Sequence, residues 1–263
     1  MPAERLRPVA LHRRIAVFFA GVQKGGTTTL HEYLRGHPAM SPPHVKELHH
    51  FDDEARNWAN GADLARLEAA FTGGDAGRLR YDATPIHGFW PPALLRIRAY
   101  NPAARLVWIF RDPVARAFSH WRMERARGEE TLSFAQAIRE GRARIAHEPP
   151  LARPLRVHSY VERGFYGQQV ANGLALFPRA QHLFLTSEEL DANPDATLAR
   201  LAAFLDIAPF APGQGLRAHV GVPMPEEAPS PADRALLLGL WRQDLARFSA
   251  LTGLCSARWL APG

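Results

Sequence analysis

Apolar residues along this chain of 263 residues follow two patterns, one typical of buried strands and the other typical of amphipathic helices. Continuous apolar runs at residues 14–22, 104–110 and 181–187 predict buried strands. A shorter and weaker strand is expected over residues 78–85, where Pro85 ends it. The runs are far too short to cross a bilayer, so no membrane span is expected.

The segments between these runs carry the spacing of helices, with glycine, proline and capping residues at their ends. Helices are predicted at 27–36, 62–71, 91–100, from Asp112 onward, and at 133–146, 165–178, 194–205 and 231–253. Loops are expected at 37–53, 147–159 and 207–231. Strands that alternate with helices indicate an α/β fold, in which a central parallel sheet is flanked by helices on both faces.

Two of the predicted strands run directly into unusual polar sequence. The first is followed by "QKGGTTT" and the second by "RDPVARAFSHW". In open parallel sheets, ligands bind at the carboxyl ends of the strands, near the point where the strand order reverses. We therefore look for the functional site in these two loops.

The first loop has the composition of an anion-binding turn. Glycines allow the backbone to approach a ligand closely, and the amides that open a helix attract negative charge. A P-loop ATPase or kinase carries its lysine after the second glycine, as in G-x-x-x-x-G-K-S/T. Here Thr27 follows Gly26 and the lysine is Lys24, so metal-assisted nucleotide chemistry is disfavoured. The alternative is a tight turn whose threonines only cap the helix.

The second loop places Arg111 at the end of a strand and Ser119 about two helical turns further on. Arg116 and Ser119 are three residues apart and share a helix face. Arg111 and Ser119 are thus candidates for binding one anion. The alternative is that Asp112 and Pro113 merely begin the helix, which leaves Ser119 without a role.

Taken together, the two loops resemble those of sulfotransferases that use 3′-phosphoadenosine 5′-phosphosulfate (PAPS), especially the heparan-sulfate type and its bacterial relatives. The stretch "KELHHFD" at 46–52 resembles the family's segment with the catalytic glutamate. "RGFYGQQVANGLALFP" at 163–178 resembles its R-G-x-Y helix, and "FSALTG" resembles its last helix. The likeness covers most of the chain in the same order.

The resemblance implies a P-loop-like three-layer α/β fold and an enzyme that transfers a sulfuryl group from PAPS. The acceptor would be a hydroxyl or amine of a small molecule or carbohydrate, and 3′-phosphoadenosine 5′-phosphate (PAP) would be released. Glu47 is implied as the general base and Lys24 as a catalytic and donor-binding residue. The other implied donor-binding residues are Gly25, Gly26, Thr27, Thr28, Thr29, Arg111, Ser119 and Arg217. His49 and Tyr166 are candidates for acceptor binding.

Several assignments have alternatives in the sequence. Glu47 is also readable as a solvated loop acid, with His49 or His50 as the base, because an unperturbed histidine titrates near neutrality. Tyr166 is most simply explained as a core or groove aromatic, and lining the acceptor site is the alternative. Trp58, Phe89 and Trp90 are candidates for the walls of the acceptor site, although aromatic residues beside prolines more often serve packing. A metal site formed by His44, His49 and His50 is disfavoured because their spacing is irregular, and no metal is expected.

Two positions depart from the family pattern. Ala83 stands where the family often has a lysine before its T-P, so a second cation near the sulfuryl group is in doubt. Arg217 lies in "GLRAHVG", which only partly matches the family's C-terminal cofactor loop. With a single cysteine, Cys255, the chain cannot form an intrachain disulfide there.

Composition and charge bear on the kind of partner the protein binds and on its location. The net charge of +6 and the isoelectric point of about 10.1 suggest an acidic partner, which is nucleic acid, an anionic surface or a small polyanion. The alternative is that the arginine-rich composition merely reflects the base composition of the genome. No helix-turn-helix or zinc-finger pattern supports a nucleic-acid-binding protein. A single cysteine and an N-terminus without an apolar signal core indicate a cytoplasmic protein. We expect one domain over residues 1–263, with residues 1–13 as a flexible N-terminus.

Overall fold

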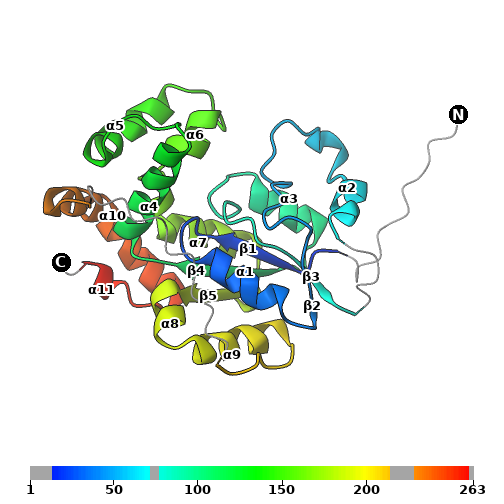
Figure 1. The fold of residues 1–263 in the computed structure, drawn as a ribbon. Coiled ribbons are helices and arrows are strands. Elements are labelled where there is room, and N and C mark those ends of the chain that lie inside the picture. The colour runs from blue at the N-terminus through cyan, green and yellow to red at the C-terminus, as the bar shows by residue number, and fades with distance from the viewer. Residues whose placement is uncertain (1–13, 72–76, 214–227, 261–263) are drawn as a thin grey trace, which may run out of the picture.

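The computed structural model of the protein describes residues 14–71, 77–213 and 228–260, and its centre is a sheet of five parallel strands (Figure 1). The strands are β1 (Val17–Gly21), β2 (Met40–Ser41), β3 (Leu79–Asp82), β4 (Arg105–Phe110) and β5 (His182–Thr186). Four of them lie within the predicted strands, which confirms the α/β class. The fifth, β2, has only two residues and falls in the predicted loop at 37–53.

Eleven α-helices surround the sheet in the part of the chain that the structure describes. They are α1 (Thr27–Arg35), α2 (Leu64–Ala69), α3 (Ala93–Tyr100), α4 (Pro113–Ala126), α5 (Phe134–Ala146), α6 (Arg153–His158), α7 (Tyr166–Leu176), α8 (Ser187–Ala192), α9 (Pro194–Leu205), α10 (Pro231–Thr252) and α11 (Ala257–Leu260). Three of these, α6, α8 and α11, were not predicted. Helix α8 follows β5 without a break, because Thr186 and Glu189 form a reciprocal capping box.

Alternate residues of the central strands face two separate cores, because side chains along a strand point to opposite faces. Phe18, Trp108 and Phe110 face the core that contains residues of α3, α7 and α10. Phe19 and Ile109 face the other core, with residues of α1, α8 and α9. The result is three layers, with α1, α8 and α9 on one side of the sheet (Figure 1).

The strand order places the two polar loops side by side. The order is β2-β3-β1-β4-β5, so the chain leaves β1 toward one edge and returns to build the other edge from β4. The reversal therefore lies between β1 and β4, which pair along Val17–Gly21. At such a reversal, the loops after the two strands diverge and leave a crevice for a ligand.

One buried side chain of β4, Trp108, restricts two other segments of the chain. It is fully buried and its indole N–H donates a hydrogen bond to His182 at 3.0 Å. A Cβ atom placed on Gly88 or Gly173 would lie 2.4 or 2.9 Å from the indole, whereas one on Gly21 would lie at an ordinary contact distance of 3.4 Å. The absence of side chains at Gly88 and Gly173 lets these two segments pack directly against the indole.

Candidate active site between β1 and β4

The loop after β1 is held so tightly that side chains are excluded from part of it. A Cβ atom on Gly25 would lie 2.3 Å from the carbonyl oxygen of Ile109 in β4. Gly26 has a φ of 108°, which a side chain would strain. Lys24 directly precedes these two glycines. Its φ is 68°, in the left-handed region that is unfavourable for a residue with a Cβ atom. Strain of this kind concentrates at functional sites.

The N-terminus of α1 is open toward this loop. Gly26 is the N-cap residue, and no side chain caps the helix by a hydrogen bond. The threonines therefore do not cap the helix, and the alternative that they serve only as caps is wrong. The first amides of a helix have no partner within it, and the helix dipole makes them attractive to an anion. This end of α1 has the properties of a phosphate site.

The loop after β4 is ordered by a different set of contacts. Asp112 caps α4 by accepting hydrogen bonds from the amides of Val114 and Ala115, both at 2.9 Å. It also pairs with Arg234 of α10 at 3.1 Å. The Arg111 side chain takes no part in this capping, and it forms no hydrogen bond or ion pair with the residues that the structure describes. Capping explains Asp112 but leaves Arg111 available for a ligand.

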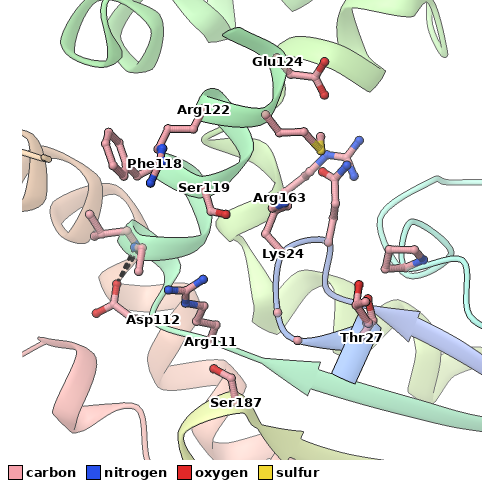
Figure 2. A pocket seen from close by; sticks show the side chains of 18 of the residues that line it. Lys24, Thr27, Arg111, Asp112, Phe118, Ser119, Arg122, Glu124, Arg163 and Ser187 are labelled. Carbon is pink, nitrogen blue, oxygen red and sulfur yellow. Dashed lines mark hydrogen bonds between the residues drawn. The ribbon is translucent and has the colours of Figure 1, made fainter. Parts of the chain in front are cut away.

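Both loops border the same cleft, which has a volume of about 2200 Å³. Lys24, Thr27, Arg111 and Ser119 surround it in Figure 2, where Ser187 at the start of α8 lies below Arg111. Glycines 25 and 26 and the other loop threonines also line it. The two predicted motifs therefore converge. Arg116 does not join them, since it is fully buried and donates to the carbonyl oxygen of Tyr160.

The cleft carries a large surplus of positive charge. Ten lysine and arginine residues but only five aspartate and glutamate residues line it. Burial lowers the pKa of Lys24, and repulsion by Arg127 and Arg111 lowers it further. Positive side chains that repel one another in the free protein are stabilised when an anion binds between them. The surplus in the cleft accounts for most of the net charge of +6, which favours a small polyanion as the ligand.

Glu47 also lines the cleft, and it belongs to a chain of charged groups. Its carboxylate pairs with Lys46 at 2.6 Å and with His49 Nε2 at 3.3 Å. His49 Nδ1 lies 2.8 Å from Asp52, and Asp52 accepts a 2.6 Å hydrogen bond from Arg156. Burial alone would raise the pKa of Glu47, but the contacts with His49 and Lys46 lower it to about 2. The Glu47 carboxylate is therefore ionised and fixed by Lys46 and His49, and it is not a freely solvated acid.

His49 should make a pH-dependent contribution to stability. Hydrogen bonds to Asp52 and Glu47 raise its pKa to about 9 in the folded protein, above the value near 6.5 of an unfolded chain. The contribution is thus complete below pH 6.5 and is lost as the pH rises through 9. His49→Gln should cost about 1 kcal/mol at pH 6, because the ring is half exposed and its ion pairs are screened.

Thermal unfolding of the wild-type protein and His49→Gln across pH 6 to 10 measures this effect. The difference in Tm between the two proteins should be largest at pH 6 and should shrink toward pH 10. A difference that grows with pH would contradict the assignment of the raised pKa to His49.

Two sets of aromatic candidates from the sequence do not line the cleft. Tyr166 is fully buried in the core, and its hydroxyl donates a 3.0 Å hydrogen bond to the carbonyl oxygen of Arg111. The expectation that it lines the acceptor site is wrong, and the core-aromatic explanation holds. Trp58, Phe89 and Trp90 likewise pack against Arg96, Arg163 and Arg156 and do not line the cleft.

The histidine alternatives separate in the structure. His50 is buried against Phe51 and Trp58, away from the cleft, and burial lowers its pKa to about 4. His44 is exposed. Within residues 14–71, 77–213 and 228–260, no group of three histidine, cysteine or acidic residues is arranged to hold a metal ion. Ala83 is fully buried, so that position supplies no charge, and Arg217 lies outside the described residues.

Sequence reasoning missed three charged residues of the ion-pair chain that holds Glu47 and His49, namely Lys46, Asp52 and Arg156. Lys46 and Asp52 lie in the stretch that drew attention to Glu47, and the spacing of Glu47, His49 and Asp52 was a usable signal. Arg156 lies 104 residues from Asp52 in a segment expected to be a loop, and nothing in the local pattern pairs them.

Comparison with known proteins identifies the relatives of this chain. Residues 14–214 match the family model described as "Sulfotransferase domain". The chain is 30% identical over 209 residues to heparan sulfate glucosamine 3-O-sulfotransferase 6 of Mus musculus, which covers 78% of this chain and 54% of the relative. It is 27% identical to bifunctional heparan sulfate N-deacetylase/N-sulfotransferase 2 of Bos taurus, over 72% of this chain and 22% of the relative. The chain thus spans about half, or less, of the length of these relatives.

A solved structure covers nearly the whole chain. The crystal structure of a sulfotransferase from Alicyclobacillus acidocaldarius superposes with a TM-score of 0.74 and 26% identity, and it covers 94% of this chain and 99% of its own. The mammalian relatives share less of their length with this chain than the bacterial structure does. Among the residues described, none of the helices combines the length and apolar character needed to span a bilayer.

Proposed function

This chain belongs to the sulfotransferase family, and from that premise we propose that it transfers the sulfuryl group of PAPS to a hydroxyl or amine acceptor. The observation that carries the proposal is the convergence of Lys24, the open N-terminus of α1, Arg111 and Ser119 on one cleft. These groups supply cations and amide donors at separated points, as a nucleotide with phosphates at both its 3′ and 5′ positions requires.

The residues present fit this donor. Gly25 leaves no room for a side chain beside β4, so the backbone amides of the loop can reach a phosphate. We assign Lys24 and the amides of residues 26–28 to the 5′-phosphosulfate, because the Gly25 and Thr29 amides already donate to the carbonyl oxygens of Val22 and Gly26. We assign Arg111 and Ser119 to the 3′-phosphate. The excess of cations over carboxylates in the cleft favours a ligand with several negative charges.

Sulfuryl transfer requires the protein to stabilise the leaving phosphate and to remove a proton from the acceptor. PAPS supplies a sulfuryl group, whose bond to the bridging phosphate oxygen breaks as the acceptor atom bonds to sulfur, with the electron pair remaining on PAP. Lys24 stabilises the negative charge that develops on the leaving phosphate. Glu47 takes the proton of the acceptor hydroxyl or amine.

The low pKa of Glu47 makes it a weak base in the free protein, and Lys46 offers a way to change this. Lys46 lines the same cleft and is paired with Glu47 at 2.6 Å. An anion in the cleft competes with Glu47 for the ammonium group. Loss of that pairing raises the pKa of Glu47, so donor binding makes Glu47 a better base.

A carbohydrate hydroxyl or amine is the acceptor that the relatives favour. Two of them are named for sulfation of heparan sulfate, a carbohydrate, one at an oxygen and one at a nitrogen. For this chain we propose a carbohydrate or small-molecule acceptor, without choosing between oxygen and nitrogen. The cytoplasmic location expected from the sequence stays a prediction.

Thermal stabilisation by candidate ligands tests the donor directly. PAP should raise the Tm by several degrees at concentrations well above its Kd, because it binds only the folded protein. ATP with Mg²⁺ and a short DNA duplex at matched concentration should raise it much less. A larger effect of ATP–Mg²⁺ would favour a kinase-like enzyme, and a larger effect of duplex DNA would favour a nucleic-acid-binding protein.

Transfer of labelled sulfate from PAPS to a panel of carbohydrate and small-molecule acceptors then tests the reaction. Labelled product from at least one acceptor is expected. Binding of PAP without transfer to any member of a broad panel would leave the donor assignment standing and reject the acceptor classes tested.

A further inference from the structure

One face of α4 borders the cleft from its first turn to its end. Ser119, Met123 and Arg127 are spaced four residues apart, and all three line the cleft. Arg127 follows the last turn of α4 and has helical backbone angles, so it continues the same face. Eight residues of helix span about 12 Å, which places Arg127 well beyond the assigned 3′-phosphate site at Ser119. The far end of this face is therefore cationic.

Arg127 is held in place by a buried carboxylate. Its guanidinium lies 3.3 Å from Glu124, whose side chain is only 4% exposed, whereas the Arg127 side chain is 60% exposed. Glu124, shown at the upper end of α4 in Figure 2, also lies 3.6 Å from His120. Glu124 thus fixes one side of the Arg127 guanidinium. The remaining N–H groups of Arg127 are available to the cleft and to solvent.

The charge of Arg127 acts on the lysine of the β1 loop. Burial lowers the pKa of Lys24 most, and among charged neighbours Arg127 lowers it more than Arg111 does. Lys24 and Arg127 also both lower the pKa of His120, after burial, Arg163 and Arg116. The two cations come from different elements, line one cavity and lie close enough for the charge of Arg127 to lower the pKa of Lys24.

We propose that Arg127 is a second cation of the sulfuryl-transfer site, where its guanidinium donates hydrogen bonds to the sulfuryl oxygens of the donor. The inference rests on the proposed function. Arg111 and Ser119 bind the end of the nucleotide that product and donor share, whereas Arg127 contacts the group that only the donor carries. Arg127 therefore distinguishes PAPS from PAP, and it stabilises the sulfuryl group during transfer.

Calorimetric titration with PAPS and with PAP, in the absence of acceptor, separates this role from others. In Arg127→Gln the affinity for PAPS should fall about tenfold, whereas the affinity for PAP should change less than twofold. The kcat for transfer should fall about 10²-fold. Arg127→Lys, which keeps the charge, should retain most of the PAPS affinity.

Arg125→Gln is the matched control, since Arg125 belongs to the same helix but binds the carbonyl oxygen of Thr131 and does not line the cleft. It should bind both nucleotides like the wild-type protein. Equal losses of PAPS and PAP affinity in Arg127→Gln would overturn the proposal, as would a rise in acceptor KM alone, which would make Arg127 an acceptor-binding residue. A wild-type protein that binds neither nucleotide would refute the proposed function, and this inference with it.

Discussion

Replacing Glu47 by glutamine should lower the kcat for sulfuryl transfer about 10³-fold while PAP affinity stays within about twofold. The amide keeps the size of the side chain and its ability to accept a hydrogen bond from Lys46, 2.6 Å away. It cannot take a proton from the acceptor. Because Glu47 is not one of the residues assigned to the nucleotide, nucleotide binding should survive. Turnover of labelled PAPS and calorimetric titration with PAP measure the two quantities.

The control for Glu47→Gln is Glu140→Gln, which neutralises an exposed carboxylate of α5 outside the cleft. This variant should turn over like the wild-type protein. If Glu47→Gln turned over as fast as the wild-type protein, Glu47 would not be the general base. A second variant, His49→Gln, would then decide whether the neighbouring histidine takes the proton instead.

Lys24→Met should lower kcat/KM about 10²- to 10³-fold, equivalent to about 3–4 kcal/mol of transition-state stabilisation. The affinity for PAP should fall as well, because the 5′-phosphate loses its cation. The free protein should be at least as stable as the wild type. Methionine fills similar space, and its neutral side chain removes the burial cost and the repulsion by Arg127 and Arg111 that lower the pKa of Lys24.

Thermal unfolding with and without PAP measures both the stability of the free Lys24→Met protein and the weakening of its PAP binding. Lys24→Met should show an unchanged or higher Tm alone and a smaller increase on adding PAP. Arg142→Met, which removes an exposed arginine paired with Glu162, should leave the increase unchanged. A Lys24→Met protein that loses stability but keeps the full response to PAP would show that Lys24 has a packing role only.

The sequence was informative wherever function and fold depend on neighbouring residues. The strands at β1, β4 and β5 have continuous apolar runs, and the loops after β1 and β4 carry their glycines, lysine, arginine and serine within a few positions. Asp112 and Pro113 mark the start of α4, and the structure confirms both. The alternation of strand and helix was enough to place both loops at one edge of a parallel sheet.

The sequence was uninformative where a contact joins distant segments. Arg156 reaches Asp52 from a short helix that has too few residues for a clear periodic pattern. Tyr166 was misplaced because a motif beside a site does not specify the direction in which its side chain points. Arg127 is one of several arginines at the end of α4, and only the packing of that helix along the cleft distinguishes it from Arg125.

Trp108 has a consequence for how this protein can change over time. Because the indole excludes a side chain at Gly173 and helps to exclude one at Gly88, neither position is independent of it. A mutant library that varies either glycine alone should recover mainly the parent residue. Once position 108 carries a smaller side chain, alanine at position 173 meets only the His182 ring, at 3.1 Å, whereas alanine at position 88 still meets the carbonyl oxygen of Ala20 at 2.7 Å. The order in which substitutions arise at positions 108 and 173 therefore decides which descendants are reachable.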